Sequence, residues 1–280
     1  MSASPASLKE ILGETGLHFS ELEDGAIGVL FTGARRTEGV VVRCRVLSGG
    51  LAAFGVSLPP FPGRKRKTTL KILLRATDAV AFTKAVLLGP DEAAYLSTLP
   101  MESLTPAVAG GVIRGLGALG DLGQGDLASR SRCWRAVMTC ADAHAQYIGA
   151  DAASAMLGQV SILPALEEEG IDFDIAPDGS SYVARLSGPD VQVLIRPTNL
   201  GVLTLAELEE APKGDEAAYM MRLLSLNTDS IVAKVGLSEG GGVSLRYEVP
   251  RLTPELVRQM RDQFTSFASD VTAIDAELGG

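Results

Sequence analysis

The chain has 280 residues, of which 46% are hydrophobic and 21% are charged, a balance typical of folded globular proteins. This length favours about two domains, each long enough for its own core. A formal net charge of −9 disfavours general nucleic-acid binding. The chain has neither a secretory signal pattern nor a run of about 18 apolar residues that could cross a membrane. We therefore expect a cytoplasmic protein without direct membrane or nucleic-acid contacts.

In chain order, the first elements expected are a short helix and three strands. Leu8, Ile11 and Leu12 follow helical spacing, and Gly16 comes after them as a C-terminal cap would. The connections between the strands that follow are short, so neighbouring strands must run antiparallel. Strands are predicted at 28–31, 39–46 and 53–58, and a second helix at 68–76.

A linker with its own helix is expected next, at residues 123–160. Its helix is predicted over 127–148, where Cys133, Cys140 and His144 are spaced by seven and four and fall near one helix face. Metal binding would need a fourth ligand from elsewhere, so a packed apolar stripe is the favoured interpretation. With Cys44 the chain has three cysteines without disulfide-scaffold spacing, and we expect reduced thiols and no metal.

The second half shows the same succession more clearly. A helix containing Ile162, Leu163 and Leu166 ends at Gly170, and three strands follow at 181–186, 191–196 and 201–205. A helix at 215–226 precedes a hairpin of 230–235 and 243–248 around a glycine-rich turn. Thr253-Pro254-Glu255 then opens a final helix. Its apolar face has a period near 3.6 and comprises Leu256, Met260, Phe264, Phe267, Val271 and Ile274.

These two successions indicate an internal repeat. Three short matches keep their order along the chain, and each falls at the same boundary between elements. They are Gly16-Leu17-His18-Phe19 with Gly170-Ile171-Asp172-Phe173, Thr77-Asp78 with Thr228-Asp229, and Leu104-Thr105-Pro106 with Leu252-Thr253-Pro254. We predict an α+β protein with similar domains at 1–122 and 161–280, each in the order α-β-β-β-α-β-β-α, that form an intrachain pseudo-dimer.

The predicted order resembles the fold of type III secretion chaperones and of the YbjN family, which are grouped as peptide-binding chaperones. The resemblance is carried by Leu223-Leu224-Ser225-Leu226-Asn227, by the strand at 231–235 with its glycine turn, and by 247–255. It covers most of 161–271 and, more weakly, 7–122. It implies a non-enzymatic adaptor, without cofactor, that holds a segment of a client protein. Because two copies are fused here, the further homodimerisation usual in such proteins stays open.

The helix at 215–226 carries the candidate binding residues. Tyr219, Met220, Met221 and Leu224 form an apolar surface too broad for one narrow stripe. Methionine recurs at adaptable binding surfaces, although core packing is the commoner role. We expect these residues either in the core, at the contact between repeats, or at a partner. Residues 161–280 hold 20 acidic and 9 basic residues, which favours solubility or a basic client.

Three other sequence patterns are candidates for a functional site. Gly115-Leu116-Gly117-Ala118-Leu119-Gly120 fits a dinucleotide-binding motif and supports the alternative of a nucleotide-binding module or enzyme, but it follows a helix start and not a strand. His18 has no nucleophile context such as G-x-S-x-G, so no catalytic residue is predicted. The basic run at 64–67 is expected to be an exposed loop entering a helix or to contact the acidic second half.

Overall fold

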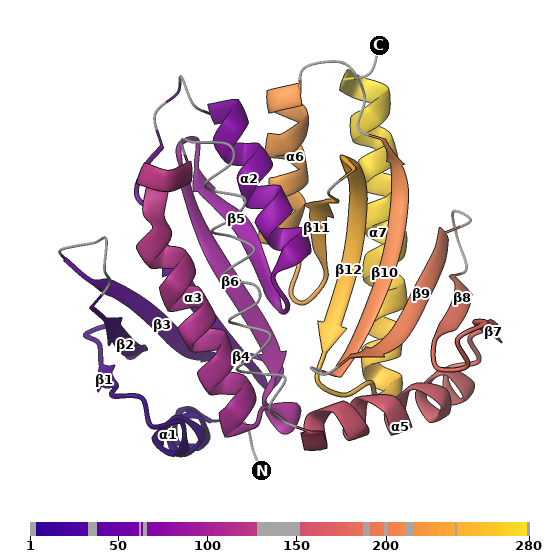
Figure 1. Cartoon of the computed structure of the whole chain (residues 1–280), viewed down its shortest axis with the longest axis horizontal. Coiled ribbons are helices and arrows are strands. Elements are labelled where there is room, and N and C mark those ends of the chain that lie inside the picture. The colour runs from indigo at the N-terminus through magenta and orange to yellow at the C-terminus, as the bar shows by residue number, and fades with distance from the viewer. Residues whose placement is uncertain are drawn as a thin grey trace.

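The protein folds into two sheet-based halves that lie side by side (Figure 1). The structure, a computed structural model, describes residues 4–278 apart from 33–37, 62, 64–65, 128–151, 187–190, 199–200, 211–215 and 239. Within these residues it contains six α-helices and two six-stranded antiparallel sheets, which confirms the predicted α+β class. No helix in this part of the chain is long and apolar enough to cross a membrane.

The first half contains a sheet in the order β1-β2-β3-β4-β6-β5. Helices α1 and α3 pack against one face of this sheet (Figure 1). The elements are α1 (Pro5–Glu14), β1 (Ser20–Glu21), β2 (Ile27–Phe31), β3 (Val40–Leu47), β4 (Leu51–Ser57), α2 (Arg66–Ala79), β5 (Thr83–Gly89), β6 (Glu92–Pro100), a 3-10 turn (Met101–Ser103) and α3 (Pro106–Leu127).

The second half contains a sheet in the order β7-β8-β9-β10-β12-β11. Helices α5 and α7 pack against it and against each other. The elements are α5 (Ala152–Glu168), β7 (Phe173–Ile175), β8 (Tyr182–Leu186), β9 (Val191–Thr198), β10 (Gly201–Glu210), α6 (Glu216–Asp229), β11 (Lys234–Leu237), β12 (Gly242–Val249) and α7 (Pro254–Leu278).

Each half has four strands before its second helix, whereas three were predicted. The additional strands, β1 and β7, have two and three residues, too few to display an alternating pattern. The strand expected at 230–235 also begins later, at Lys234, because residues 230–233 turn at the end of α6. The predicted linker at 123–160 spans the end of α3, the start of α5 and residues outside the described ranges, among them most of the predicted 127–148 helix.

Local signals account for the helix ends that were predicted. Gly170 has a φ of 62°, and its N–H donates to the Glu167 carbonyl as the chain leaves α5. At the start of α7, the Thr253 hydroxyl accepts a hydrogen bond of 3.3 Å from the Leu256 N–H. The predicted apolar face of this helix is buried throughout, from Leu256 to Ile274. Cap chemistry and period therefore fixed these elements correctly.

The two halves meet through their central helices. Helix α2 of the first half packs against α6 and against β11 of the second half, while α6 packs against α2 and against β5. Each central helix therefore lies on the other half's inner edge strand (Figure 1). The buried apolar core continues from one half into the other.

Candidate functional site

Two buried lysines cross the contact between the halves in opposite directions. Lys84 of β5 donates a hydrogen bond of 2.5 Å from Nζ to the Ser230 carbonyl, just past the end of α6. Lys234 of β11 donates one of 2.8 Å to the Val80 carbonyl, just past the end of α2. Unpaired carbonyls give a helix C-terminus partial negative charge. Each lysine therefore caps the central helix of the other half.

The surroundings of the two lysines differ. Lys234 lies 3.0 Å from the Glu248 carboxylate, and both side chains are buried. In the described part of the chain Lys84 contacts carbonyl oxygens but no carboxylate. Burial, with the nearby charge of Lys234 as the second cause, lowers the pKa of Lys84 to about 7. Burial also lowers the pKa of Lys234, although Glu248 opposes that shift.

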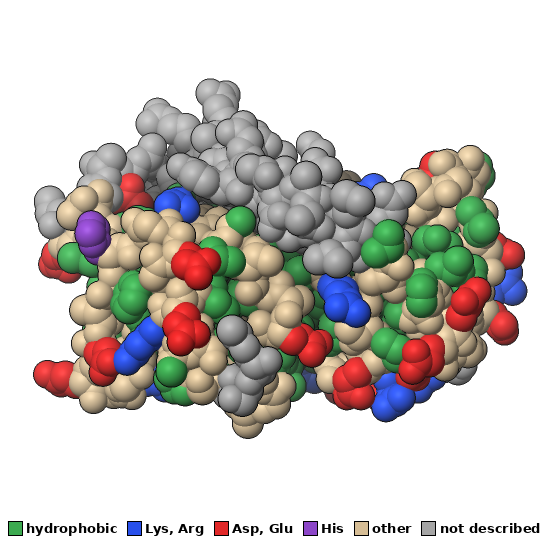
Figure 2. Space-filling view, turned by 90° about the horizontal axis from the view of Figure 1, so that it is seen from below, with side chains coloured by type: hydrophobic (Ala, Val, Ile, Leu, Met, Phe, Trp, Pro, Cys, Tyr) green, Lys and Arg blue, Asp and Glu red, His purple; other side chains and the backbone are tan. Residues whose placement is uncertain are grey.

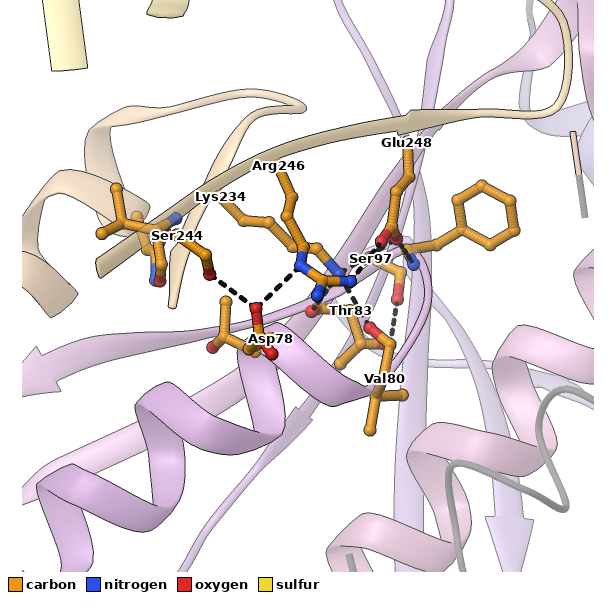
Figure 3. Close-up of polar contacts among 12 residues, drawn as sticks. Asp78, Val80, Thr83, Ser97, Lys234, Ser244, Arg246 and Glu248 are labelled. Atoms are coloured by element: carbon orange, nitrogen blue, oxygen red, sulfur yellow. Dashed lines mark hydrogen bonds and ion pairs between the residues drawn. The ribbon is translucent and has the colours of Figure 1, made fainter. Parts of the chain in front are cut away.

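Three further side chains extend this polar cluster, as Figure 3 shows. Asp78 at the end of α2 accepts hydrogen bonds from Arg246 Nε at 2.8 Å and from the Ser244 hydroxyl at 2.5 Å. The Glu248 carboxylate accepts the backbone N–H of Phe82. Strand β12 is thereby bonded to the end of α2 through Asp78 and to the α2–β5 connection through Glu248.

A cleft of about 130 Å³ lies beside this cluster. Phe82 forms part of its wall and has a φ of 56°, a left-handed conformation that costs an L-residue about 1–2 kcal/mol. Its N–H bond to Glu248 helps to hold it there. Strained residues of this kind concentrate at functional sites. The cleft is lined by Ala79, Ala81, Phe82, Thr198, Val202, Leu203, Arg246 and Glu248.

Sequence reasoning did not single out Lys84, Lys234, Arg246 or Glu248. A signal was present, because both lysines fall at the start of apolar strand sequences and lysine is rarely buried without partners. They also lie 150 positions apart, within the spacing of the repeat matches. The contact with the carbonyls at the opposite helix end required the fold.

The predicted residues of α6 face two different neighbours. Tyr219 is buried, and burial followed by the charge of Asp275 on α7 raises its pKa. Glu216 and Thr228, at the two ends of α6, both contact the first half: Glu216 binds Lys67 at 2.8 Å, and the Thr228 hydroxyl donates to the Leu87 carbonyl at 3.4 Å.

Met220 and Leu224 lie between those two contacts at intervals of four, so they belong to the same stripe of the helix. Both are buried, whereas Met221 is partly buried. The structure therefore places this stripe of α6 against the first half, and a partner could reach Met220 or Leu224 only if the halves moved apart.

The glycine run at 115–120 lies inside α3. A side chain at Gly120 would place its Cβ 2.6 Å from both Val40 and Val56, and one at Gly117 would meet the Phe31 ring. These glycines let the helix approach the sheet closely. Inside a helix, their N–H groups are used by the preceding turn and do not form a phosphate cradle.

The remaining candidates lie apart from the polar cluster. His18 is exposed on the α1–β1 connection, and burial raises the pKa of the Cys44 thiol to about 12. Cys133, Cys140 and His144 lie outside the described residues. Among the residues that are described, no group of three His, Cys, Asp or Glu side chains could hold a metal ion. In the basic run, Lys67 contacts Glu216 of the acidic half, as one of the two expectations had it.

In the described part of the chain, the helices that contact β3 and β4 are α1 and α3, which lie on one face of the first sheet. Along β3 burial alternates, so Val42 and Cys44 point to the helices while Val41 and Leu47 point away. Leu30 on β2 pairs with Val41 and is 61% exposed. The open face, as we name it, consists of Leu30, Val41, Arg43, Arg45 and Leu47.

Its two arginines lie between the apolar positions, and both bind Asp24. From Val41 to Leu47 the open face measures about 20 Å, at about 3.3 Å per strand residue. In the other half, Val160 and Leu163 of α5 and Ile175 of β7 are also exposed. Figure 2 shows hydrophobic side chains gathered at the right, on the side of the second half.

Comparisons with protein-family models, with curated proteins and with solved structures found no match for this chain.

Proposed function

We propose that the protein is a non-enzymatic, chaperone-like adaptor that holds a segment of another protein. The observation that carries this proposal is the open face, where Leu30, Val41 and Leu47 remain exposed on a sheet whose other face is covered by helices. Leu30 and Val41 are neighbours in the strand pairing, and Leu47 lies further along the same strand. Exposed apolar side chains that share one face of a folded protein support an interaction surface. The similar order of elements in the two halves supports an intrachain pseudo-dimer as the scaffold.

The charges on the open face indicate the kind of segment it fits. Arg43 and Arg45 separate the apolar positions, and in the described part of the chain they share a single carboxylate, that of Asp24. A client segment with both apolar and acidic residues would fit this face. Its apolar side chains would be buried against those of the open face, and its carboxylates would pair with Arg43 and Arg45. The acidic composition of the second half favours a basic client there, so the two halves differ in the charge that they would attract.

Affinity capture from lysate of the source organism tests the proposal. The bait is compared with Leu30→Gln/Val41→Thr/Leu47→Gln, which makes the open face polar and keeps one β-branched position. The control is Leu88→Gln/Ile175→Gln, which changes exposed apolar residues elsewhere. We expect the wild type and the control to retain the same small set of proteins, identified by mass spectrometry, and the open-face variant to lose it.

Direct binding of a purified captured protein then completes the test. Its affinity should fall by about tenfold or more for the open-face variant, because the variant loses the three apolar side chains that the captured protein would cover. Equal binding by the open-face variant, or no specific protein retained by a folded wild type, would refute the proposal. Release by high salt would show that charged groups take part in docking.

A further inference from the structure

Arg246 brings unused hydrogen-bond donors to the cleft beside the polar cluster. Its Nε is bound to Asp78, whereas Nη1 is 3.8 Å from the nearest Glu248 oxygen, beyond hydrogen-bond range. Within the described ranges the two Nη atoms make no hydrogen bond, and the side chain is 21% exposed. A guanidinium has five N–H donors, so four of them remain for a ligand.

Glu248 brings an unused acceptor to the same cleft. Its Oε2 accepts the Phe82 N–H and lies 3.0 Å from Lys234 Nζ. Arg246 Nη1 lies 3.8 Å from its Oε1, beyond hydrogen-bond range, and among the described residues no hydrogen bond to Oε1 forms. Donor and acceptor therefore stand next to each other at the wall of one cleft.

The charges of the polar cluster balance when Lys84 is neutral, above about pH 7. Asp78 and Glu248 are acidic, while Arg246 and Lys234 are basic. A carboxylate ligand bound to Arg246 would be close to two carboxylates, and a cation bound to Glu248 would be close to two basic groups. Burying unbalanced charge is costly. A neutral group that accepts on one side and donates on the other avoids both costs.

The shape and size of the cleft fit such a group with a short apolar stem. Apart from Thr198, Arg246 and Glu248, the lining residues are apolar. A volume of about 130 Å³ is close to the ~150 Å³ of an engineered cavity that takes benzene. An amide with two or three attached carbons is of this size.

We propose that this cleft binds a neutral amide, with Arg246 Nη donating to the amide oxygen and Glu248 Oε1 accepting its N–H. The amide can come from a free small molecule or from an Asn, Gln or peptide unit of a client. The site goes beyond the proposed function, because it lies at the contact between the halves and not on the open face.

Titration of the full chain with propionamide, followed by ¹H–¹⁵N NMR, tests this site. The reporters are the Phe82 N–H and the Arg246 Nε–H signals. Three compounds matched to propionamide in size serve as controls. Propionate is negatively charged, propylammonium is positively charged, and butanone is a neutral acceptor without an N–H donor. We expect saturable shifts of both reporters with propionamide, at concentrations about tenfold lower than with the other three. An equal or stronger response to propionate or propylammonium, or no saturable response to propionamide, overturns the proposal.

A variant assigns the response to Glu248. Glu248→Gln keeps size and removes the charge, so propionamide binding should weaken by about tenfold while the preference against propionate shrinks. Glu207→Gln is the matched control, an exposed position on the neighbouring strand about 13 Å along from Leu203. It should leave the titration unchanged. Unchanged binding in Glu248→Gln, with the fold intact by circular dichroism, contradicts the assignment.

Two capped tripeptides separate the sources of the amide. Tighter binding of acetyl-Ala-Gln-Ala-N-methylamide than of acetyl-Ala-Ala-Ala-N-methylamide identifies a side-chain amide, and equal binding identifies a peptide unit. Binding of propionamide alone assigns the cleft to small amides. Because these probes do not touch the open face, failure here leaves the capture result standing, and failure of capture leaves the cleft result standing.

Discussion

Lys84 carries a charge state set by the contact between the halves. Its Nζ donates to the carbonyls of Ser230 and Ile231, and the charge of Lys234 acts on it. The neutral amine can donate to a carbonyl as the ammonium does, and burial disfavours the charged form. Lys84 therefore links β5 to the backbone that follows α6, and it titrates near neutral pH.

Stability should therefore depend on pH through this residue. The pKa of Lys84 falls from 10.5 to about 7 on folding, so between these values the unfolded chain binds a proton that the folded chain does not. The free energy of unfolding should rise with pH across this window, by up to about 1.4 kcal/mol per pH unit from one group. Below about pH 7 both states bind the proton and this contribution levels off.

Lys84→Met should flatten that rise, as measured by urea unfolding at several pH values between 7 and 10. Lys71→Met, on α2 and without a hydrogen bond or ion pair among the described residues, is the control and should keep the wild-type slope. An identical slope in Lys84→Met would show that another group controls this pH dependence.

At the scale of the element, the glycines of α3 allow this helix to pack closely against the first sheet. An alanine at Gly120 would gain helix propensity, worth about 1 kcal/mol, but its Cβ would lie 2.6 Å from two valine methyl groups. Overpacking of a core costs about 1–3 kcal/mol. The close approach of α3 to the sheet therefore favours glycine over alanine at position 120.

Gly120→Ala is expected to lower the free energy of unfolding by about 1–2 kcal/mol. The same substitution at Gly13 should raise it by about 0.5–1 kcal/mol, because that position of α1 has open space around it. Urea unfolding of both variants checks the opposite signs. A stabilised Gly120→Ala would mean that Val40 and Val56 move aside at little cost.

The elements that could be predicted are those with local signals. Period and capping residues defined α7 from Thr253 to Ile274, and turn residues separated β8, β9 and β10 nearly where the structure has them. The short strands β1 and β7 lack any period, and the late start of β11 is decided by the turn after α6. The cleft could not be predicted, because its walls come from α2 and the α2–β5 connection of the first half and from β9, β10 and β12 of the second, which only the contact between halves brings together.

At the scale of the whole molecule, the contact between the halves makes them dependent on each other. Helices α2 and α6 bury apolar stripes against the opposite half, and Asp78 joins α2 to Arg246 and Ser244 of β12. A half separated from its partner would expose these groups to water. The two sheets should therefore unfold as one cooperative unit.

Asp78→Ala tests this dependence, since it leaves Arg246 and Ser244 without their acceptor. We expect a loss of about 1–3 kcal/mol, with faster amide hydrogen exchange in both sheets. Asp24→Ala also removes an acceptor shared by two side chains, but on the exposed surface of the first half, where solvent screens ion pairs, and should cost much less than Asp78→Ala. Faster exchange confined to one sheet in Asp78→Ala would indicate two independent units.

Joining the halves in one chain also frees them from exact symmetry. In a dimer of identical subunits, every residue at the axis occurs twice and must suit both places. Here Arg246 of β12 pairs with Lys234, whereas Leu96 of β6 pairs with Lys84. Two residues further along, β12 has Glu248 and β6 has Thr98. The Arg–Glu pair therefore occurs in the second half and not in the first, and an amide held by it would bind with a stoichiometry of one per chain.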